Sequence, residues 1–189
     1  MSEESALLTQ AMAGDVEAFG RLVERYQGRL VNFVFHLVGN QDDAEEIAQE
    51  TFLRAYRAIS TFRGHSSLYT WFCSIATRVA IRWIRAGPLS ENPPRFDDAQ
   101  PDHPANQDEG GNDPAASAAR HETVCQVRRA IQQLPERYRV VLVLVDIDGL
   151  EYAEAAEVLR IPINTVRSRL ARARELLRRK LRPLLASEG

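Results

Sequence analysis

Arginine side chains are concentrated near the C-terminal end of the chain, in a pattern that suits contact with nucleic acid. The 189-residue chain has a formal net charge of −2, yet residues 160–182 hold nine basic side chains and one acid, Glu175. Arginine can bind guanine or phosphate through two parallel hydrogen bonds. Apolar residues at helical spacing lie on both sides of a tight turn at Ile161 and Pro162. This arrangement predicts a helix-turn-helix with a basic second helix.

The apolar residues of the second helix indicate which of its faces is turned outward. A stripe at helical spacing is expected to be buried, and it consists of Val166, Leu170, Ala173 and Leu177. The side chains expected on or beside the outward face are Thr165, Arg167, Ser168, Arg169 and Arg172. Composition and spacing favour DNA as the ligand of this face. A solvated basic helix or a protein contact is the alternative.

A second stretch with nucleic-acid chemistry spans residues 62–85, where aromatic and arginine side chains are interleaved. It begins as a polar loop containing Gly64 and continues as an apolar helix. Aromatic rings can stack on unpaired bases while arginine binds phosphates. The same rings could instead fill a small core, and the pattern alone supports both interpretations equally. The aromatics are Tyr69, Trp71, Phe72 and Trp83, and the cations are Arg63, Arg78, Arg82 and Arg85.

Two earlier helices are predicted to position this stretch. Asp15 suits the N-cap of a helix that ends at Gly39 and Asn40. Asp42, three residues before Glu45, resembles a capping box and begins a helix with a regular apolar face. Composition alone favours a solvated surface for the opposite, polar face, although Leu53 within it hints at a partner.

The C-terminal half contains an apolar run that is ambiguous by composition. VVLVLV, residues 140–145, is rich in β-branched residues and would suit a strand. Tyr138, Val141, Leu142 and Val145 keep helical spacing, and the neighbouring segments are also helical. We therefore expect a helix over residues 136–147.

Charge and composition divide the chain into three parts. Residues 1–85 hold nine basic and ten acidic side chains, residues 86–120 two and seven, and residues 121–189 thirteen and nine. The middle part contains six of the nine prolines and few apolar residues, which predicts a disordered or extended linker. The two cysteines have no metal-ligand spacing, and the N-terminus lacks a signal peptide. These features predict a cytoplasmic protein that is not inserted in a membrane.

Two segments resemble the extracytoplasmic-function sigma factors of bacterial RNA polymerase. They are DDAEEIAQETFLRAYRAISTFRGHSSLYTWFCSIATRVA and, far downstream, LPERYRVVLVLVDIDGLEYAEAAEVLRIPINTVRSRLARARELLRRKL. The resemblance implies an all-α protein of two small helical domains joined by a flexible acidic linker, without a catalytic site or cofactor. It assigns sigma region 2 to residues 1–86, the linker to 87–120 and sigma region 4 to 121–186.

The resemblance also implies roles for individual residues. The residues implied to bind the β′ coiled coil of core polymerase are Glu46, Gln49, Glu50, Leu53 and Arg54. Those implied to bind the opened −10 promoter element are Phe62, Arg63, Ser66, Ser67, Tyr69, Trp71, Arg78 and Arg82. Those implied to bind the −35 element as duplex are Thr165, Arg167, Ser168, Arg169 and Arg172. Further implied partners are the polymerase β flap and an anti-sigma factor, with no small-molecule substrate.

Two positions depart from the family pattern. Arg78 stands where many members have an asparagine that contacts the −10 element, so an unusual −10 preference is expected. Asn164 stands where glycine is frequent, and asparagine is tolerated near a helix start.

Two other classes of function remain as alternatives. The first is a stand-alone helix-turn-helix regulator that does not bind core polymerase and uses residues 1–85 for sensing or dimerisation. The second is an enzyme, which the sequence disfavours because His36, His65, His103 and His121 have neither metal-ligand nor catalytic-triad spacing.

Overall fold

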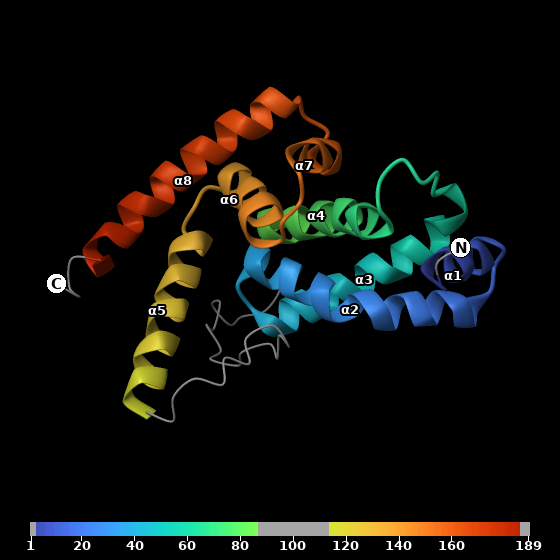
Figure 1. Ribbon diagram of the computed structural model, residues 1–189, viewed down its shortest axis with the longest axis horizontal. Helices are drawn as coiled ribbons and strands as arrows, with labels where there is room; N and C mark the ends of the chain where they lie inside the picture. The colour runs from blue at the N-terminus through green and yellow to red at the C-terminus, as the bar shows by residue number, and fades with distance from the viewer. Residues whose placement is uncertain (1–2, 87–113, 186–189) are drawn as a thin grey trace.

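The computed structural model describes residues 3–86 and 114–185, and every element in these two segments is a helix. The first segment forms α1 (Glu3–Met12), α2 (Val16–Val38), α3 (Gln41–Ala58), the 3₁₀ helix η1 (Ile59–Thr61) and α4 (Leu68–Ala86). The second forms α5 (Pro114–Gln132), α6 (Glu136–Leu142), the π-helical turn η2 (Val143–Ile147), α7 (Tyr152–Leu159) and α8 (Ile163–Leu185). The all-α prediction is confirmed (Figure 1). No helix in the described segments combines the length and apolar character needed to cross a membrane.

Helix α2 begins and ends at the residues that its sequence predicts. The Asp15 Oδ1 atom accepts hydrogen bonds from the backbone N–H groups of Glu17 at 2.9 Å and Ala18 at 3.1 Å. At the other end Gly39 has a φ of 83°, in the left-handed region that favours glycine. A Cβ atom on Gly39 would lie 2.9 Å from Cδ of Gln132. The backbone conformation therefore favours glycine here, and a Cβ atom would also require the Gln132 side chain to move.

The start of α3 differs from the prediction based on Asp42 and Glu45. The N-cap is Asn40, whose Oδ1 atom accepts a hydrogen bond from the backbone N–H of Asp43 at 3.0 Å. Asp42 and Asp43 instead lie in the first helical turn, where the helix dipole favours negative charge. Because Gly39 ends α2 directly before Asn40, α2 and α3 form a tight antiparallel pair.

The apolar run of the C-terminal half is helical, as predicted from its spacing. Helix α6 continues into the π-helical turn η2, and the side chains from Val140 to Leu144 are buried. The wider π turn changes the direction in which the following side chains point. Asp146 forms a bidentate ion pair with Arg174 of α8, at 2.9 and 2.6 Å. Asp148, which follows the turn, faces α4 instead.

Helix α5 begins earlier than the sequence pattern indicates. Its first residue is Pro114, so residues 114–120, which the composition assigns to the linker, are helical. Proline is tolerated in the first turn of a helix, and the alanine-rich residues after it favour helix formation. The rest of the predicted linker, residues 87–113, lies outside the described residues.

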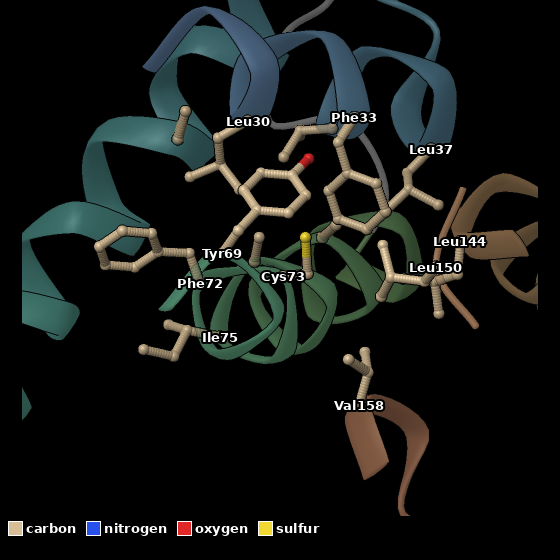
Figure 2. Packing of buried hydrophobic residues seen from close by; sticks show 14 of the residues in the cluster. Leu30, Phe33, Leu37, Tyr69, Phe72, Cys73, Ile75, Leu144, Leu150 and Val158 are labelled. Carbon is tan, nitrogen blue, oxygen red and sulfur yellow. The ribbon is translucent and has the colours of Figure 1, made fainter. Parts of the chain in front are cut away.

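The N-terminal and C-terminal halves share one hydrophobic core. Helix α4 packs against α2 and α3 on one side and against α7 on the other. Figure 2 shows Leu37 of α2 and Cys73 of α4 close to Leu144 and Leu150 of the C-terminal half. These side chains belong to one continuous cluster of buried residues. The arrangement places the predicted −10 segment at the contact between the two halves.

Candidate nucleic-acid interface

Helices α7 and α8 form the predicted helix-turn-helix, and backbone hydrogen bonds fix the turn between them. Arg160 caps the C-terminal end of α7 with a φ of 53°, in the left-handed region. The Ile161 N–H donates a hydrogen bond back to α7 at 3.1 Å. The Pro162 carbonyl accepts one from the Thr165 N–H at 2.8 Å, so proline lies directly before Ile163, the first residue of α8. The turn is therefore short and ordered by the backbone itself.

The buried and exposed faces of α8 lie where the sequence predicts them. Val166, Leu170 and Ala173 are buried and Leu177 is partly buried. The opposite side, which we call the α8 outer face, consists of the exposed Arg167, Ser168 and Arg172 and the half-buried Thr165 and Arg169. In Figure 1, α8 lies at the edge of the molecule, and α6 and α7 pack against it.

Short polar contacts along α8 orient the side chains of the outer face. Arg167 Nη1 donates a hydrogen bond to Asn164 Oδ1 at 3.2 Å. Arg172 forms an ion pair with Glu175 at 2.5 Å, and this contact holds the pKa of the Glu175 carboxyl below its usual value. The single acid of this basic stretch is thus bound to one of its arginines. The outer face keeps a strongly positive character, which suits binding to phosphate.

The predicted −10 residues divide into a buried group and an exposed group. The Tyr69 and Phe62 side chains are 5% and 8% exposed, respectively. Trp71 is partly buried, and its ring centre lies 5.4 Å from that of Phe62. Arg63, Ser67, Arg78 and Arg82 are exposed, and Ser66 is half-buried. The aromatic residues therefore pack into the core, while the polar residues face solvent.

A cluster of polar contacts covers the first turn of α4. The Tyr69 hydroxyl donates a hydrogen bond to Asp148 Oδ1 at 2.7 Å, and Thr70 Oγ1 donates one to Glu154 Oε1 at 2.7 Å. The Arg29 guanidinium carbon lies 3.7 Å from the centre of the Tyr69 ring, and Arg29 Nη2 donates to the Asp148 carbonyl at 2.9 Å. These contacts, called the α4 cover here, join the N-terminal half to the C-terminal half. They occupy the position that the resemblance assigns to −10 DNA.

The Asp148 carboxyl at the centre of the α4 cover is almost completely buried, with 5% of its side chain exposed. Burial raises its pKa, although the Tyr69 hydroxyl and Arg29 act in the opposite direction. Its Oδ2 atom lies 3.5 Å from Arg29 Nη2 but makes no hydrogen bond. Burial likewise raises the pKa of Tyr69 and of the Cys73 thiol beside it. The cover therefore holds a carboxylate in a poorly solvated site.

Ser67 and Arg78 also have local roles that the sequence did not indicate. Ser67 Oγ accepts a hydrogen bond from the Thr70 N–H at 3.0 Å and so caps α4. Arg78 Nε donates to the Ser74 carbonyl at 2.9 Å. Partial burial lowers the pKa of Arg78, and the charges of Arg160 and Arg54 add to this effect. Arg78 thus lies among other cations at the edge of the contact between the halves.

The polar face of α3 is exposed at the residues predicted to bind core polymerase. Glu46 and Gln49 are exposed, and Leu53 is 56% exposed. Glu50 and Arg54 form an ion pair at 2.6 Å. Gln49 and Leu53 also line a groove of about 810 Å³ between α2 and α3.

The α2 wall of this groove was missed by the sequence analysis. It is formed mainly by small and apolar residues, which are Val16, Phe19, Gly20, Val23, Gln27, Gly28 and Val31. A detectable signal was present, because the apolar positions of α2 cover more of the helix than one core-facing stripe requires.

Comparisons with known proteins identify both halves of the chain. The sigma-70 region 2 family model matches residues 22–87, and the sigma-70 region 4 family model matches residues 126–177. The RNA polymerase sigma-H factor of Pseudomonas aeruginosa is 37% identical, over 97% of this chain and 96% of the relative. The ECF RNA polymerase sigma-E factor of Escherichia coli K12 is 36% identical, over 98% and 99%.

Solved structures agree in fold. CnrH in complex with the cytosolic domain of CnrY matches with a TM-score of 0.68 at 23% identity, over the full length of both chains. The sigma factor RpoE in complex with the anti-sigma factor NepR, from Bartonella quintana, matches with a TM-score of 0.65 at 24% identity, over 88% of this chain and 98% of the other. With both region models matched in order and relatives similar over nearly the whole length, the chain belongs to the sigma-70 family as an extracytoplasmic-function RNA polymerase sigma factor.

Proposed function

We propose that this sigma factor recognises promoters with two separate DNA-binding surfaces and attaches both to core polymerase through α3. The observation that carries the proposal is the α8 outer face, a solvent-accessible arginine-rich surface on a well-ordered helix-turn-helix. Side chains of this type and spacing can enter the major groove and contact base edges and phosphates. We assign the −35 element to this face, through Thr165, Arg167, Ser168, Arg169 and Arg172.

The −10 element is assigned to the loop before α4 and to α4 itself. The exposed Arg63, Arg78 and Arg82 suit the phosphates of an opened strand, and Tyr69 and Trp71 suit stacking on its bases. Ser66 and Ser67 lie in the loop between them. Extrusion of a base costs a few kcal/mol, so a site that holds it must supply aromatic and polar contacts together. Phe62 supports the ring of Trp71 in this scheme.

The attachment to core polymerase is assigned to the exposed face of α3. Glu46, Gln49 and Glu50 offer acidic and amide groups, and Leu53 offers an exposed apolar side chain. Glu50 and Arg54 form an ion pair on this face. This combination of a polar rim around an apolar centre is typical of protein interfaces. The β′ coiled coil of the polymerase is the partner that the family relationship supports.

The division into domains and the further partners follow the same scheme. Residues 1–86 act as region 2, residues 87–120 as a connection and residues 121–186 as region 4, which also contacts the polymerase β flap. An anti-sigma factor holds the protein inactive, in line with the RpoE–NepR complex of similar fold. The protein works in the cytoplasm, serves genes that respond to stress or another signal, and has no catalytic activity of its own.

In vitro transcription with purified core polymerase tests the proposal. The full chain is expected to direct initiation at specific start sites from a fragment library of the source genome, whereas core polymerase alone is not. Sequencing of the RNA 5′ ends then yields the −35 and −10 sequences. A stand-alone helix-turn-helix regulator, the second candidate, would bind duplex DNA but leave initiation by core polymerase unchanged. Absence of any start site that depends on the protein would therefore reject the proposal.

A further inference from the structure

Two carboxylates of the C-terminal half lie on the first turn of α4. Asp148 Oδ1 accepts a hydrogen bond from the Tyr69 hydroxyl at 2.7 Å, and Glu154 Oε1 accepts one from Thr70 Oγ1 at 2.7 Å. Helix α4 is 19 residues long, and the N-terminal turn of such a helix carries partial positive charge. The first turn of α4 therefore binds two anionic groups, and both come from the other half of the chain.

Arg29 of α2 brings a full positive charge to the same place. Its guanidinium carbon lies 3.7 Å from the centre of the Tyr69 ring, within the range of a cation–π contact. Its Nη2 atom donates a hydrogen bond to the Asp148 carbonyl at 2.9 Å and lies 3.5 Å from Asp148 Oδ2. Asp148 thus presents both carboxylate oxygens and its carbonyl oxygen to one guanidinium and one hydroxyl. A phosphate of a nucleic-acid backbone offers oxygen atoms to arginine and tyrosine in a similar way.

The groups that hold Asp148 are positioned by the N-terminal half alone. The ring of Tyr69 stacks on that of Tyr26, with 5.9 Å between the ring centres. Figure 2 shows the Tyr69 ring on the side of α4 that faces Leu30 of α2. Arg29 follows Tyr26 by three residues on α2, and 49% of its side chain is exposed. The Tyr69 hydroxyl and the Arg29 guanidinium therefore stay together when the C-terminal half moves away, but they lose the anion between them.

Asp148 fills this position imperfectly. Its side chain is 5% exposed, and its Oδ2 atom is buried without a hydrogen bond from any residue that the structure describes. A buried carboxylate oxygen without a hydrogen bond costs free energy. A phosphate whose outer oxygen faces water would not have this cost. Exchange of the Asp148 carboxylate for a phosphate is therefore easier than loss of a fully hydrogen-bonded carboxylate.

We propose that Arg29, Tyr69 and Thr70 form a binding site for backbone phosphates of the opened −10 strand. In the closed form, in which the two halves pack together, the carboxylates of Asp148 and Glu154 occupy this site in place of the phosphates. The inference rests on the proposed promoter function and extends it. It adds Arg29 and Thr70 to the residues assigned to −10 DNA. It also gives the Tyr69 hydroxyl a phosphate ligand, beside the stacking proposed for the ring.

Binding of −10 DNA to the holoenzyme, the complex of this protein with core polymerase, tests the site. The probe is a single-stranded oligonucleotide with the non-template −10 sequence of a start site mapped by in vitro transcription. Arg29→Ala is expected to weaken its binding about fivefold, because one phosphate contact is lost. The slope of log affinity against log salt concentration should become shallower by about 0.7, the value for one phosphate of a single strand. If Arg29 only held the two halves together, its removal would leave this binding unchanged or make it tighter.

Arg21→Ala is the matched control for Arg29→Ala. Arg21 also lies on α2, has 56% of its side chain exposed and forms an ion pair with Glu3 of α1. Its removal deletes the same charge from the same helix and should change neither the affinity nor the salt slope. Thr70→Val keeps the shape of a buried side chain and removes its hydroxyl, so binding should weaken about threefold. Unchanged affinity of this variant would remove Thr70 from the site.

The free protein tests whether Asp148 occupies the site. Asp148→Ala removes the competing carboxylate and is expected to strengthen binding of the same oligonucleotide at least threefold. Adding Arg29→Ala to this variant should abolish the gain. Inorganic phosphate, at the same concentration of phosphate groups, should not displace the strand, because it lacks the base contacts. Displacement would show that the site binds free phosphate instead of the strand.

The outcomes separate this inference from the proposed function. If the parent holoenzyme fails to bind the oligonucleotide, the proposed function is wrong. If the parent binds it and Arg29→Ala binds equally tightly with the same salt slope, Arg29 is not a phosphate ligand. If Asp148→Ala keeps the circular dichroism spectrum of the parent but binds the strand no more tightly, the carboxylate does not occupy a phosphate position.

Discussion

The α8 outer face and the first turn of α4 carry similar residues but lie in opposite environments. Arg167, Ser168 and Arg172 of α8 are open to solvent, whereas Tyr69 of α4 is 5% exposed beneath Asp148. A duplex-binding face needs mainly charged and hydroxyl groups, which water solvates well. A surface that stacks on bases needs aromatic rings, and these are favourably buried when no base is present. The difference in exposure between the two faces is therefore consistent with the ligands proposed for them, duplex DNA for α8 and unpaired bases for α4.

The α4 cover is the polar part of a contact between the two halves that also includes the shared hydrophobic core. Asp148, Arg29, Glu154 and Thr70 hold it with hydrogen bonds and charges rather than with a wholly apolar contact. Burying a carboxylate is costly, so part of the favourable energy is offset in the closed form. Tyr69 can contact a nucleotide base only after the segment around Asp148 moves away. If Tyr69 binds −10 DNA as proposed, recognition of that DNA and closure of the two halves exclude each other.

The largest effect on the contact between the two halves is expected from Asp148→Arg. This change removes the acceptor of the Tyr69 hydroxyl and places a buried cation beside Arg29, which costs about 3–5 kcal/mol in the closed form. Small-angle X-ray scattering should show a larger radius of gyration, because the two halves separate. Binding to a −35 duplex should persist, since the α8 outer face does not include Asp148.

Asp148→Asn is the matched control for that change. Asparagine keeps the shape of the side chain and still accepts the hydrogen bond from Tyr69, so the closed form is expected to remain dominant. If Asp148→Arg gives the same radius of gyration as the parent protein while remaining folded, the cover does not hold the halves together.

The second prediction separates the open face from the rest of the molecule. Arg169→Ala removes a candidate base or phosphate contact and should weaken −35 duplex binding by about 1–3 kcal/mol, roughly fivefold to 150-fold. Affinity for core polymerase should not change. Glu50→Ala should do the reverse, because Glu50 lies on the face of α3 that we propose to bind core polymerase. Fluorescence anisotropy measures the affinity of each variant for duplex DNA and for core polymerase. If both variants lose the same affinity for the same partner, the two surfaces do not have separate roles.

Local features of this molecule could be predicted from the sequence with good accuracy. The helices follow from apolar spacing, and the buried stripe of Val166, Leu170 and Ala173 follows from the same periodicity. The cap at Asp15 and the turn at Gly39 are likewise properties of a few neighbouring residues. Such features depend on short-range geometry, which the order of residues specifies directly.

Contacts between distant parts of the chain could not be predicted in this way. Tyr69 and Asp148 are separated by 79 positions, and no periodicity relates them. The sequence left open whether the aromatics of residues 62–85 fill a core or stack on bases, because a ring suits both environments. The α2 wall of the groove was missed for a related reason. Spacing shows that Val16 and Val23 lie on one face of a helix. It does not show that this face lines an open groove between α2 and α3.

A smaller effect on the closed form than that of Asp148→Arg is expected from Tyr69→Phe. The change removes one hydrogen bond to Asp148 and keeps the buried ring, so the closed form should lose about 1 kcal/mol. Tyr26→Phe is the matched control, because Tyr26 donates an equally short hydrogen bond, 2.7 Å, to Glu4 within the N-terminal half. Both variants should melt at a lower temperature, but only Tyr69→Phe should increase the radius of gyration. An equal increase in both would show that the Tyr69 contact has no special role in closure.

The smallest expected effect is the dependence of closure on pH through the Asp148 carboxyl. Burial raises its pKa in the closed form, whereas in the open form the carboxyl is solvated and returns toward its usual value. The closed form therefore binds a proton more tightly, and closure should gain stability as the pH falls through the raised pKa toward the usual one. The groups that face Asp148 are Tyr69 and Cys73 on α4, Arg29 on α2 and Glu154 on α7. Asp148→Asn removes this titration, so the difference between the two proteins in the fraction closed isolates it from the other carboxyls. If acid opens the parent protein more than Asp148→Asn, the buried carboxylate favours closure in its charged form, and the contact with Arg29 outweighs the cost of burial.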